Sequence, residues 1–426
     1  MKTEPVIGMD FGTTNSAIAV AGSDRQATLA TFAGGTGAFR SILYFPAKER
    51  GSQERPEIQA GPDAISSYLE ADTKGRLVVS IKSYLASSLF TSTSINGRNY
   101  TLEELIAIIM RRLRMAAMQQ FDVEASRLVL GRPVKFAGAE TVADETLALT
   151  RLRAAAQLAG FGEVTFELEP VAAAYQYETQ LDHDELVLIG DFGGGTSDFT
   201  LAQLGPGRKK DGRNPVIGTS GVAIAGDTFD SRIMMHLVAP KLGLGSNYIS
   251  QGKVLPVPVW VFTKLSHWHQ MFLLKDPKTM ASLREVKVQA EEPQKVAALI
   301  EIIKENLGYA LYRAVEQTKV GLTEELIASF LFTQSTVHLE ESLERWQFES
   351  WIQDDIQKIA ACIRSLFDQC GVSYSDIGSV FLTGGSSFVP VVRRFFSRTF
   401  GADKLKSGEE LTTVAKGLAL RALEHS

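Results

Sequence analysis

Near its N-terminus the chain reads Gly8-Met9-Asp10-Phe11-Gly12-Thr13-Thr14-Asn15-Ser16, and this stretch decides the fold. The apolar run Val6–Met9 leads into it and the apolar run Ala17–Ala21 follows, so two strands joined by a long polar turn are expected. A simple hairpin needs only two turn residues, whereas this turn sets a glycine beside hydroxyl and amide residues that can surround an anion. Gly12 lets the backbone come close to a ligand, and Asp10 offers the oxygen ligand that a hydrated divalent cation prefers. Taken alone, the stretch fits a plain polar turn equally well.

The same arrangement occurs a second time, which favours a ligand site over a plain turn. The apolar run Leu186–Ile189 leads into Gly190-Asp191-Phe192-Gly193-Gly194-Gly195-Thr196-Ser197-Asp198, and the alternating run Phe199–Leu204 follows. In this repeat Asp191 corresponds to Asp10. An internal repeat of this kind predicts two similar lobes, each with a phosphate-gripping hairpin and one carboxylate. Two carboxylates that face one triphosphate and its Mg²⁺ would form a nucleotide site.

Composition limits the class of protein. A chain of 426 residues is longer than one typical core, so at least two domains are expected. The formal net charge of −5 argues against a protein that binds nucleic acid electrostatically. Two cysteines, Cys362 and Cys370, fit a reducing compartment and are expected to be inert thiols rather than a disulfide. With no signal pattern at the N-terminus and no apolar run of roughly 20 residues, we expect a cytoplasmic protein without a membrane span.

The two glycine-rich stretches resemble the phosphate loops of the DnaK-type chaperone ATPases, within the actin-like ATPase superfamily. Other segments resemble that family in the same order: Ile81-Lys82-Ser83, Gly131-Arg132-Pro133-Val134, Glu169-Pro170-Val171-Ala172-Ala173-Ala174, Gly226-Asp227-Thr228-Phe229-Asp230, Glu316-Gln317-Thr318-Lys319 and Leu382-Thr383-Gly384-Gly385-Ser386. The resemblance runs from Val6 to about Leu423 and is strongest to the short YegD-type chaperone-like proteins. It implies an α/β fold with two lobes, the actin-like ATPase fold, in which duplicated ribonuclease-H-like lobes surround a nucleotide cleft.

The resemblance also implies ATP or ADP with Mg²⁺ as cofactors and assigns the site residues. Its catalytic residues match Lys82, Glu169, Asp191 and Thr196, and its metal-binding carboxylates match Asp10 and Asp191. The nucleotide-binding positions match Gly12, Thr13, Thr14, Asn15, Gly193, Gly194, Gly195, Thr196, Gly226, Asp227, Glu316, Lys319, Gly384, Gly385, Ser386 and Phe388. From the residues alone, Lys82 reads as a surface charge and Glu169 as a carboxylate favoured at a helix start. Likewise, Glu316 and Lys319 read as a surface ion pair three residues apart.

Two departures from the family pattern affect the expected function. The family commonly holds adenine between two arginines, but the matching positions are Val320 and Phe388, which favours weaker nucleotide binding. The family's switch proline matches Pro133, yet the arginine that partners it matches Leu149. Arg151 and Arg153 lie nearby in the sequence and are candidates to replace it.

The expected domains follow the repeat. Lobe I is expected over residues 1–182, with a C-terminal helix at 410–424 crossing back to it, and lobe II over residues 183–409. Within lobe II, residues 242–293 form an atypical segment where the resemblance is thin, and its part from Leu255 to Trp268 is a candidate docking surface. Locally, we expect a strand over Leu77–Ile81 that delivers Lys82, and a capping-box helix that starts at Thr101.

The function expected from the resemblance is a chaperone-like ATPase that hydrolyses ATP slowly and closes its lobes to act on a partner protein or co-chaperone. Because the sequence stops at Ser426, just after the last expected helix, no peptide-binding domain is expected. Two alternatives share the scaffold, namely a small-molecule kinase of the sugar-kinase type and an actin-like filament protein. A P-loop enzyme is excluded, because no G-x-x-x-x-G-K-[ST] pattern occurs in the sequence.

Overall fold

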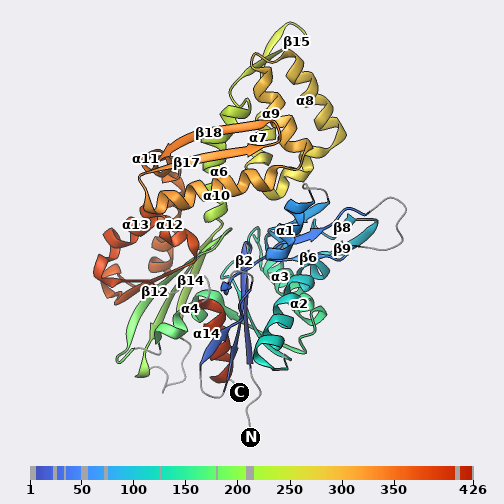
Figure 1. Ribbon diagram of the computed structural model, residues 1–426. Helices are drawn as coiled ribbons and strands as arrows, with labels where there is room; N and C mark the ends of the chain where they lie inside the picture. Colours follow the sequence, from blue (N-terminus) through green and yellow to red (C-terminus); the bar gives the residue numbers. More distant parts are fainter. Residues whose placement is uncertain are drawn as a thin grey trace. The chain divides into compact units, whose positions relative to one another are not determined.

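A computed structural model describes residues 6–22, 26–32, 35–48, 56–71, 75–124, 126–178, 181–207, 215–407 and 413–424 (Figure 1). The chain divides into two compact units. The first unit comprises residues 1–226 and 358–426, and the second unit comprises residues 227–357. None of the helices in the described part of the chain combines the length and the hydrophobicity that a membrane crossing requires. The expected boundary between lobes at residue 182 stays a prediction.

The first unit contains a sheet with the strand order β11-β10-β1-β2-β3, in which β4 also pairs with β2. Its strands are β1 (Val6–Phe11), β2 (Asn15–Ala21), β3 (Ala27–Leu29), β4 (Phe39–Arg40), β10 (Arg127–Arg132) and β11 (Glu163–Leu168). Strands β1 and β2 are antiparallel with Phe11 opposite Ser16, so the expected hairpin forms. Successive side chains of a strand point to opposite faces, and in β2 Ile18 lies in a large hydrophobic core while Ala17 packs against the C-terminal helix. Both faces of β1 and β2 are therefore buried.

A second sheet of the first unit repeats this hairpin. Its strand order is β14-β13-β12-β19-β20. The strands are β12 (Glu185–Phe192), β13 (Ser197–Leu204), β14 (Val216–Val222), β19 (Ser379–Thr383) and β20 (Leu405–Ser407). Strands β12 and β13 are antiparallel with Phe192 opposite Ser197, the same register as in the first hairpin. Strand β19 runs parallel to β12 and places Thr383 beside Asp191.

Helices of the first unit pack on these two sheets. The first unit has the helices α1 (Pro62–Glu70), α2 (Leu102–Phe121), α3 (Val142–Leu158), α4 (Glu169–Glu178), α12 (Gln353–Cys370, which starts in the second unit), α13 (Pro390–Phe400) and α14 (Thr413–Glu424). The expected capping box of α2 is confirmed, because the Thr101 hydroxyl accepts from the Glu104 N–H and the Glu104 carboxylate accepts from the Thr101 N–H. Both cysteines are free thiols, as expected.

Short elements complete the first unit. A small sheet contains β5 (Leu43–Phe45), β6 (Gln59–Ala60) and β7 (Arg76–Val78), and a separate hairpin contains β8 (Ser92–Ile95) and β9 (Arg98–Thr101). The strand expected to deliver Lys82 is wrong in its length, because β7 ends at Val78 and Lys82 lies in a 3-10 helix, Ile81–Tyr84. Ser80, just before this helix, has a left-handed backbone with φ of 51°, which ends the extended conformation.

The second unit is built around helices and two hairpins. Its helices are α6 (Gly226–Ile233, which begins at the unit boundary), α7 (Val259–Leu265), α8 (Pro277–Gln289), α9 (Pro293–Lys304), α10 (Gly308–Glu324) and α11 (Arg345–Trp351). The hairpins are β15 (Asn247–Ser250) with β16 (Lys253–Pro256), and β17 (Ile327–Gln334) with β18 (Val337–Glu344). Helices α9 and α10 are separate elements, with residues 305–307 between them. Asn306, between them, is left-handed with φ of 58° and interrupts the helical backbone.

Helix α14 packs closely on helix α4 through small residues, and this contact yields a stability prediction. A Cβ atom on Gly417 would lie 1.8 Å from the carbonyl oxygen of Ala172, which is backbone and has no room to move. Alanine normally favours a helix over glycine by about 1 kcal/mol, but forced overlap in a packed interior costs about 1–3 kcal/mol or more. We therefore expect Gly417→Ala to lower the free energy of unfolding by about 1–3 kcal/mol, measured by urea denaturation.

The matched control is Gly162→Ala, where the nearest atom to an added Cβ is 3.8 Å away. A Gly417→Ala protein as stable as its parent would contradict the packing of α14 on α4.

Candidate functional site

A buried ion pair lies at the centre of the first unit. The Lys82 ammonium is 2.7 Å from the Glu169 carboxylate, and their side chains are each 9% exposed. Lys82 comes from the 3-10 helix, and Glu169 is the first residue of α4, directly after β11. Burial alone would lower the pKa of Lys82, but the carboxylates of Glu169 and Asp10 outweigh it and raise that pKa above its usual value. The ammonium therefore stays charged near neutral pH.

The two aspartates of the repeated hairpins belong to the same electrostatic cluster. Burial, followed by repulsion from Glu169 and Asp191, raises the pKa of Asp10 well above its usual value, and Lys82 offsets part of this. Burial and repulsion from Glu169 likewise raise the pKa of Asp191 to about 6. The Thr383 hydroxyl donates a hydrogen bond of 2.7 Å to the Asp191 carboxylate and opposes that rise. The structure thus brings the predicted residues Asp10, Lys82, Glu169 and Asp191 together.

A third aspartate joins the cluster, and the sequence analysis did not assign it a role. Asp198 is 2% exposed, and burial followed by repulsion from Glu169 and Asp191 raises its pKa well above the usual value. It accepts hydrogen bonds from the hydroxyl of Thr196 at 3.0 Å and from the backbone N–H of Lys135 at 3.4 Å. Its place in the second hairpin sequence, next to Ser197, was the only signal that could have identified it.

The turns of the two hairpins face each other in the first unit. A Cβ on Gly12 would lie 2.0 Å from the carbonyl oxygen of Asn15, so glycine alone fits there. A Cβ on Gly195 would come within 3.9 Å of the Thr13 hydroxyl, which shows how near the second turn is to the first. The predicted residues Thr13 and Gly195, from the two turns, therefore lie close to each other.

The segment after β19 packs on the second hairpin. Gly384 is left-handed with φ of 81°, and a Cβ there would lie 2.1 Å from the carbonyl oxygen of Phe192. The Ser386 hydroxyl donates to the carbonyl oxygen of Gly193 at 3.4 Å. These contacts place the predicted residues Gly384 and Ser386 beside the turn that follows Asp191, with the exposed Gly385 between them.

Four carboxyl groups around one ammonium leave this site with excess negative charge. Burial makes that charge costly, because water no longer screens it. A bound cation would relieve the repulsion, and clustered oxygen donors suit a hard divalent ion. Among the residues that the structure describes, no three His, Cys, Asp or Glu side chains are close enough to hold a metal by themselves. Magnesium fits such a site, since it commonly keeps several waters and uses only one or two carboxylates with substrate phosphates.

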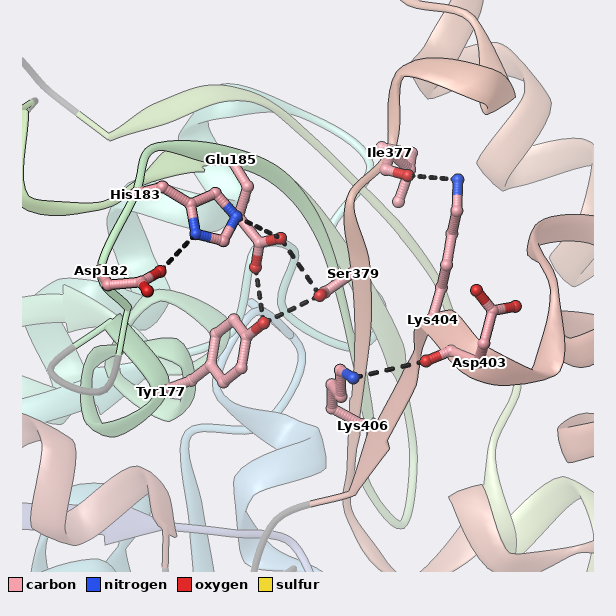
Figure 2. A network of polar contacts seen from close by, with 9 residues as sticks. All are labelled: Tyr177, Asp182, His183, Glu185, Ile377, Ser379, Asp403, Lys404 and Lys406. Atoms are coloured by element: carbon pink, nitrogen blue, oxygen red, sulfur yellow. Dashed lines mark hydrogen bonds and ion pairs between the residues drawn. The ribbon is translucent and has the colours of Figure 1, made fainter.

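The other end of helix α4 is fixed by a polar network, which Figure 2 shows. The Tyr177 hydroxyl donates to the Glu185 carboxylate at 2.5 Å and lies 2.8 Å from the Ser379 hydroxyl. Burial and the Glu185 carboxylate raise the pKa of Tyr177 to about 12, so the phenol remains a donor. His183 extends the network, with Nδ1 2.6 Å from the Asp182 carboxylate and Nε2 3.9 Å from that of Glu185. Helix α4 is thereby attached to the first residues of both β12 and β19.

The predicted nucleoside contacts of the second unit form their own cluster. The Lys319 ammonium lies 2.8 Å from the Asp230 carboxylate, and the Tyr312 hydroxyl donates to the same oxygen at 3.1 Å. Burial, then repulsion from Asp230, raises the pKa of Asp227 to about 6. Glu316 pairs with Arg313 at 2.8 Å. The sequence analysis missed Tyr312, a buried tyrosine one turn before Glu316.

The two positions that match the family's adenine-holding arginines are exposed. Val320 of the second unit is 58% exposed, and Phe388 of the first unit is 38% exposed. The Arg393 guanidinium lies 5.9 Å from the centre of the Phe388 ring, so an arginine accompanies this aromatic after all. Arg151 and Arg153, the candidates to replace the arginine that partners the switch proline, bind other groups. Arg153 donates to the Val164 carbonyl oxygen and lies over the Phe166 ring, while Arg151 binds the segment that follows Lys82.

Comparison with known proteins identifies one family. The family model described as "Hsp70 protein" matches residues 6–241 and 292–425. Curated relatives include the protein named "Chaperone protein DnaK" of Deinococcus proteolyticus, 26% identical over 428 residues that cover 98% of this chain and 58% of the relative. The protein of the same name from Thermosipho africanus is 26% identical over 429 residues, covering 99% of this chain and 59% of that relative. The chain thus spans less than two thirds of the length of these relatives.

The raised pKa of Asp191 gives a prediction about stability and pH. A carboxyl with a pKa of about 6 in the folded protein against 3.8 in the unfolded chain stabilises the fold below pH 3.8, and that stability is lost as pH rises through 6. In Asp191→Asn the side chain is neutral at every pH. Without nucleotide or Mg²⁺, we expect this variant at pH 7.5 to be more stable than its parent by about 1–3 kcal/mol, with the difference vanishing near pH 4.

Urea denaturation at both pH values measures the effect. The exposed loop carboxyl of Glu124 supplies the control, since Glu124→Gln should change stability little at either pH. An Asp191→Asn protein that is less stable than its parent at pH 7.5 would contradict the proposed charge repulsion.

Proposed function

Because the chain belongs to the Hsp70 family, we propose that it binds ATP with Mg²⁺ and hydrolyses the nucleotide slowly to ADP and phosphate in the charged site of its first unit. The family match confirms the actin-like ATPase fold and the resemblance to DnaK-type ATPases expected from the sequence. The observation that carries the proposal is the buried Lys82–Glu169 pair, which lies among the carboxyl groups of Asp10 and Asp191.

The residues of the first unit support this chemistry in separate roles. The backbone N–H groups and hydroxyls of the two turns, at residues 12–15 and 193–196, would surround the phosphates. A magnesium ion held through its waters by Asp10 and Asp191 would neutralise the phosphate charge. The Lys82 ammonium, kept charged by its carboxylate neighbours, would stabilise the charge that develops in the transition state. Glu169 would orient the attacking water, and Thr196 would bind a phosphate oxygen.

The nucleoside contacts are the finer part of the proposal. We propose that Phe388, with Arg393 beside it, stacks on the base, since aromatic rings and guanidinium groups both bind flat π systems. Gly384 and Gly385 would let the backbone approach the nucleoside phosphate. In the second unit, the roles of Asp227, Glu316 and Lys319 in binding the nucleoside remain predictions.

We further propose that nucleotide state changes the affinity for a cytoplasmic partner protein or co-chaperone. A ligand shifts such an equilibrium only if it binds the two conformations differently. Residues 242–291 fall outside the family match and contain hairpin β15–β16 and helices α7 and α8. Val254, Leu255 and Trp260 in this segment are 63%, 38% and 45% exposed, which supports the earlier expectation of a docking surface here.

The hydrolysis proposal is tested by measuring phosphate release from ATP and Mg²⁺ with purified protein. We expect slow release by the parent that neither sugars nor other small acceptors increase. Lys82→Ala should lower kcat on the order of 10²-fold, because it removes a group that acts in the transition state. Nucleotide affinity, measured by binding, should change much less.

Lys48→Ala, which removes an exposed lysine of the same unit, is the matched control. A Lys82→Ala protein with full turnover would overturn the assignment. Sugar-dependent transfer of phosphate would instead support the kinase alternative.

The partner proposal predicts that captured proteins differ between nucleotide states. We expect a triple variant, Val254→Ser, Leu255→Ser and Trp260→Ser, to lose a partner that parent protein captures in only one state, since these side chains are exposed and their loss should not unfold the unit. Pull-downs with Lys82→Ala protein in ATP and parent protein in ADP measure this. Val142→Ser, at an apolar residue 83% exposed in the first unit, is the control. Capture of the same proteins in both states would contradict the proposed nucleotide-dependent switch. Only the proposal of nucleotide binding would then stand.

A further inference from the structure

We propose that Arg151 is a positioning residue that holds the turn carrying Lys82, a role that rests on the proposed hydrolysis of ATP. Arg151 lies in α3, and its side chain is 11% exposed. Its guanidinium donates to the carbonyl oxygens of Ser87 and Phe90, each at 2.8 Å, and of Leu85 at 3.2 Å. A longer contact of 3.4 Å reaches the carbonyl oxygen of Tyr84. The Arg151 side chain thus contacts four carbonyl groups of the segment that follows Lys82.

This segment has little regular structure of its own. After the 3-10 helix Ile81–Tyr84 it continues through single turns, in which the Ser87 N–H donates to Tyr84 and the Phe90 N–H donates to Ser87. A chain of such turns has weak geometry and leaves carbonyl groups to be satisfied from outside. On its other side, the turn begins at the left-handed Ser80. The position of Lys82 therefore depends on contacts from neighbouring helices.

Arginine is suited to this task in a way that lysine is not. The planar guanidinium presents five N–H donors in a fixed fork, so it can bind several carbonyl oxygens at once. The Glu103 carboxylate, at the start of α2, lies 3.3 Å from Nε of Arg151. It therefore binds the part of the guanidinium group that does not face the carbonyl oxygens. Lysine would keep the charge near Glu103 but could not span the carbonyl groups from residue 84 to residue 90.

The contact links the buried ion pair to the helix that follows the family's switch segment. Helix α3 begins at Val142, shortly after Gly131-Arg132-Pro133, and the matched relay position on it is Leu149. Arg151 is on the same helix but acts on a different target, the turn that presents Lys82 to Glu169. Since a misplacement of about 1 Å in a catalytic group can cost on the order of 10²-fold in rate, a looser turn should lower kcat before it affects nucleotide binding.

The test compares Arg151→Lys and Arg151→Ala with the parent in ATP turnover, nucleotide binding and thermal unfolding. We expect kcat to fall about 10-fold or more in both variants, while the nucleotide Kd changes less than about threefold. Added guanidinium ion should restore part of the turnover of Arg151→Ala. Hydrogen exchange of the amides at residues 83–90 should increase in Arg151→Lys whether or not the protein hydrolyses ATP.

The matched control is Arg111→Ala, which removes another arginine-to-carbonyl bond between α2 and α3, of 2.6 Å to Leu158, without touching residues 80–90. This variant should keep the parent's turnover. Unchanged exchange at residues 83–90, or a kcat of the folded Arg151→Lys protein within about twofold of the parent, would overturn the proposal. A parent that releases no phosphate would refute the proposed function instead, and the exchange measurement would still decide whether Arg151 holds the turn.

Discussion

The ion pair between Lys82 and Glu169 joins two groups 87 residues apart in the sequence and largely excludes both from water. Burying a charge costs several kcal/mol, roughly, even after relaxation, and a partner offsets this only when the geometry is good. Here the surroundings make the cost larger, because Asp10, Asp191 and Asp198 add negative charge around one ammonium. An arrangement that lowers stability in this way is expected at a site whose ligand supplies the missing positive charge.

The repeated hairpin explains how the chain can assemble this cluster. Each aspartate stands at the end of a buried strand, and the next residues turn back at once into the second strand of the hairpin. The turn at Gly12 has no room for a side chain at that position. Gly384 packs a third segment against the second turn, and there too a side chain would overlap the backbone. At each of these two turns, backbone segments therefore approach each other more closely than side chains would allow. A polyanion bound there would meet N–H groups from two turns and carboxylates that need a cation.

Much of this arrangement could be predicted because its signals are local. The two glycine-rich turns, the strands that flank them and the capping box at Thr101 each depend on residues within a few positions of one another. The parts that could not be predicted depend on distant contacts. Lys82 was expected at a strand end, yet the left-handed Ser80 places it in a 3-10 helix. From the residues alone, Lys319 fits a surface ion pair with Glu316 three residues away, and the structure adds a bond from Lys319 to Asp230, which is 89 residues away. No local pattern encodes such a partner, since a lysine has the same helical preference with either one.

Helix α4 connects these features within the first unit. Its first residue is Glu169, and at the opposite end Tyr177 is hydrogen-bonded to the first residues of β12 and β19 (Figure 2). Those two strands end beside each other at Asp191 and Thr383, which are themselves hydrogen-bonded. Glu169 and Asp191 are therefore connected a second time, outside the site. This connection runs through α4, the Tyr177–Glu185 hydrogen bond and β12. The backbone contact of Ala172 with Gly417 also holds α4 against α14. Because close-packed elements shift as rigid bodies rather than bend, a ligand that moves Glu169 relative to Asp191 must displace α4 as a whole against these contacts.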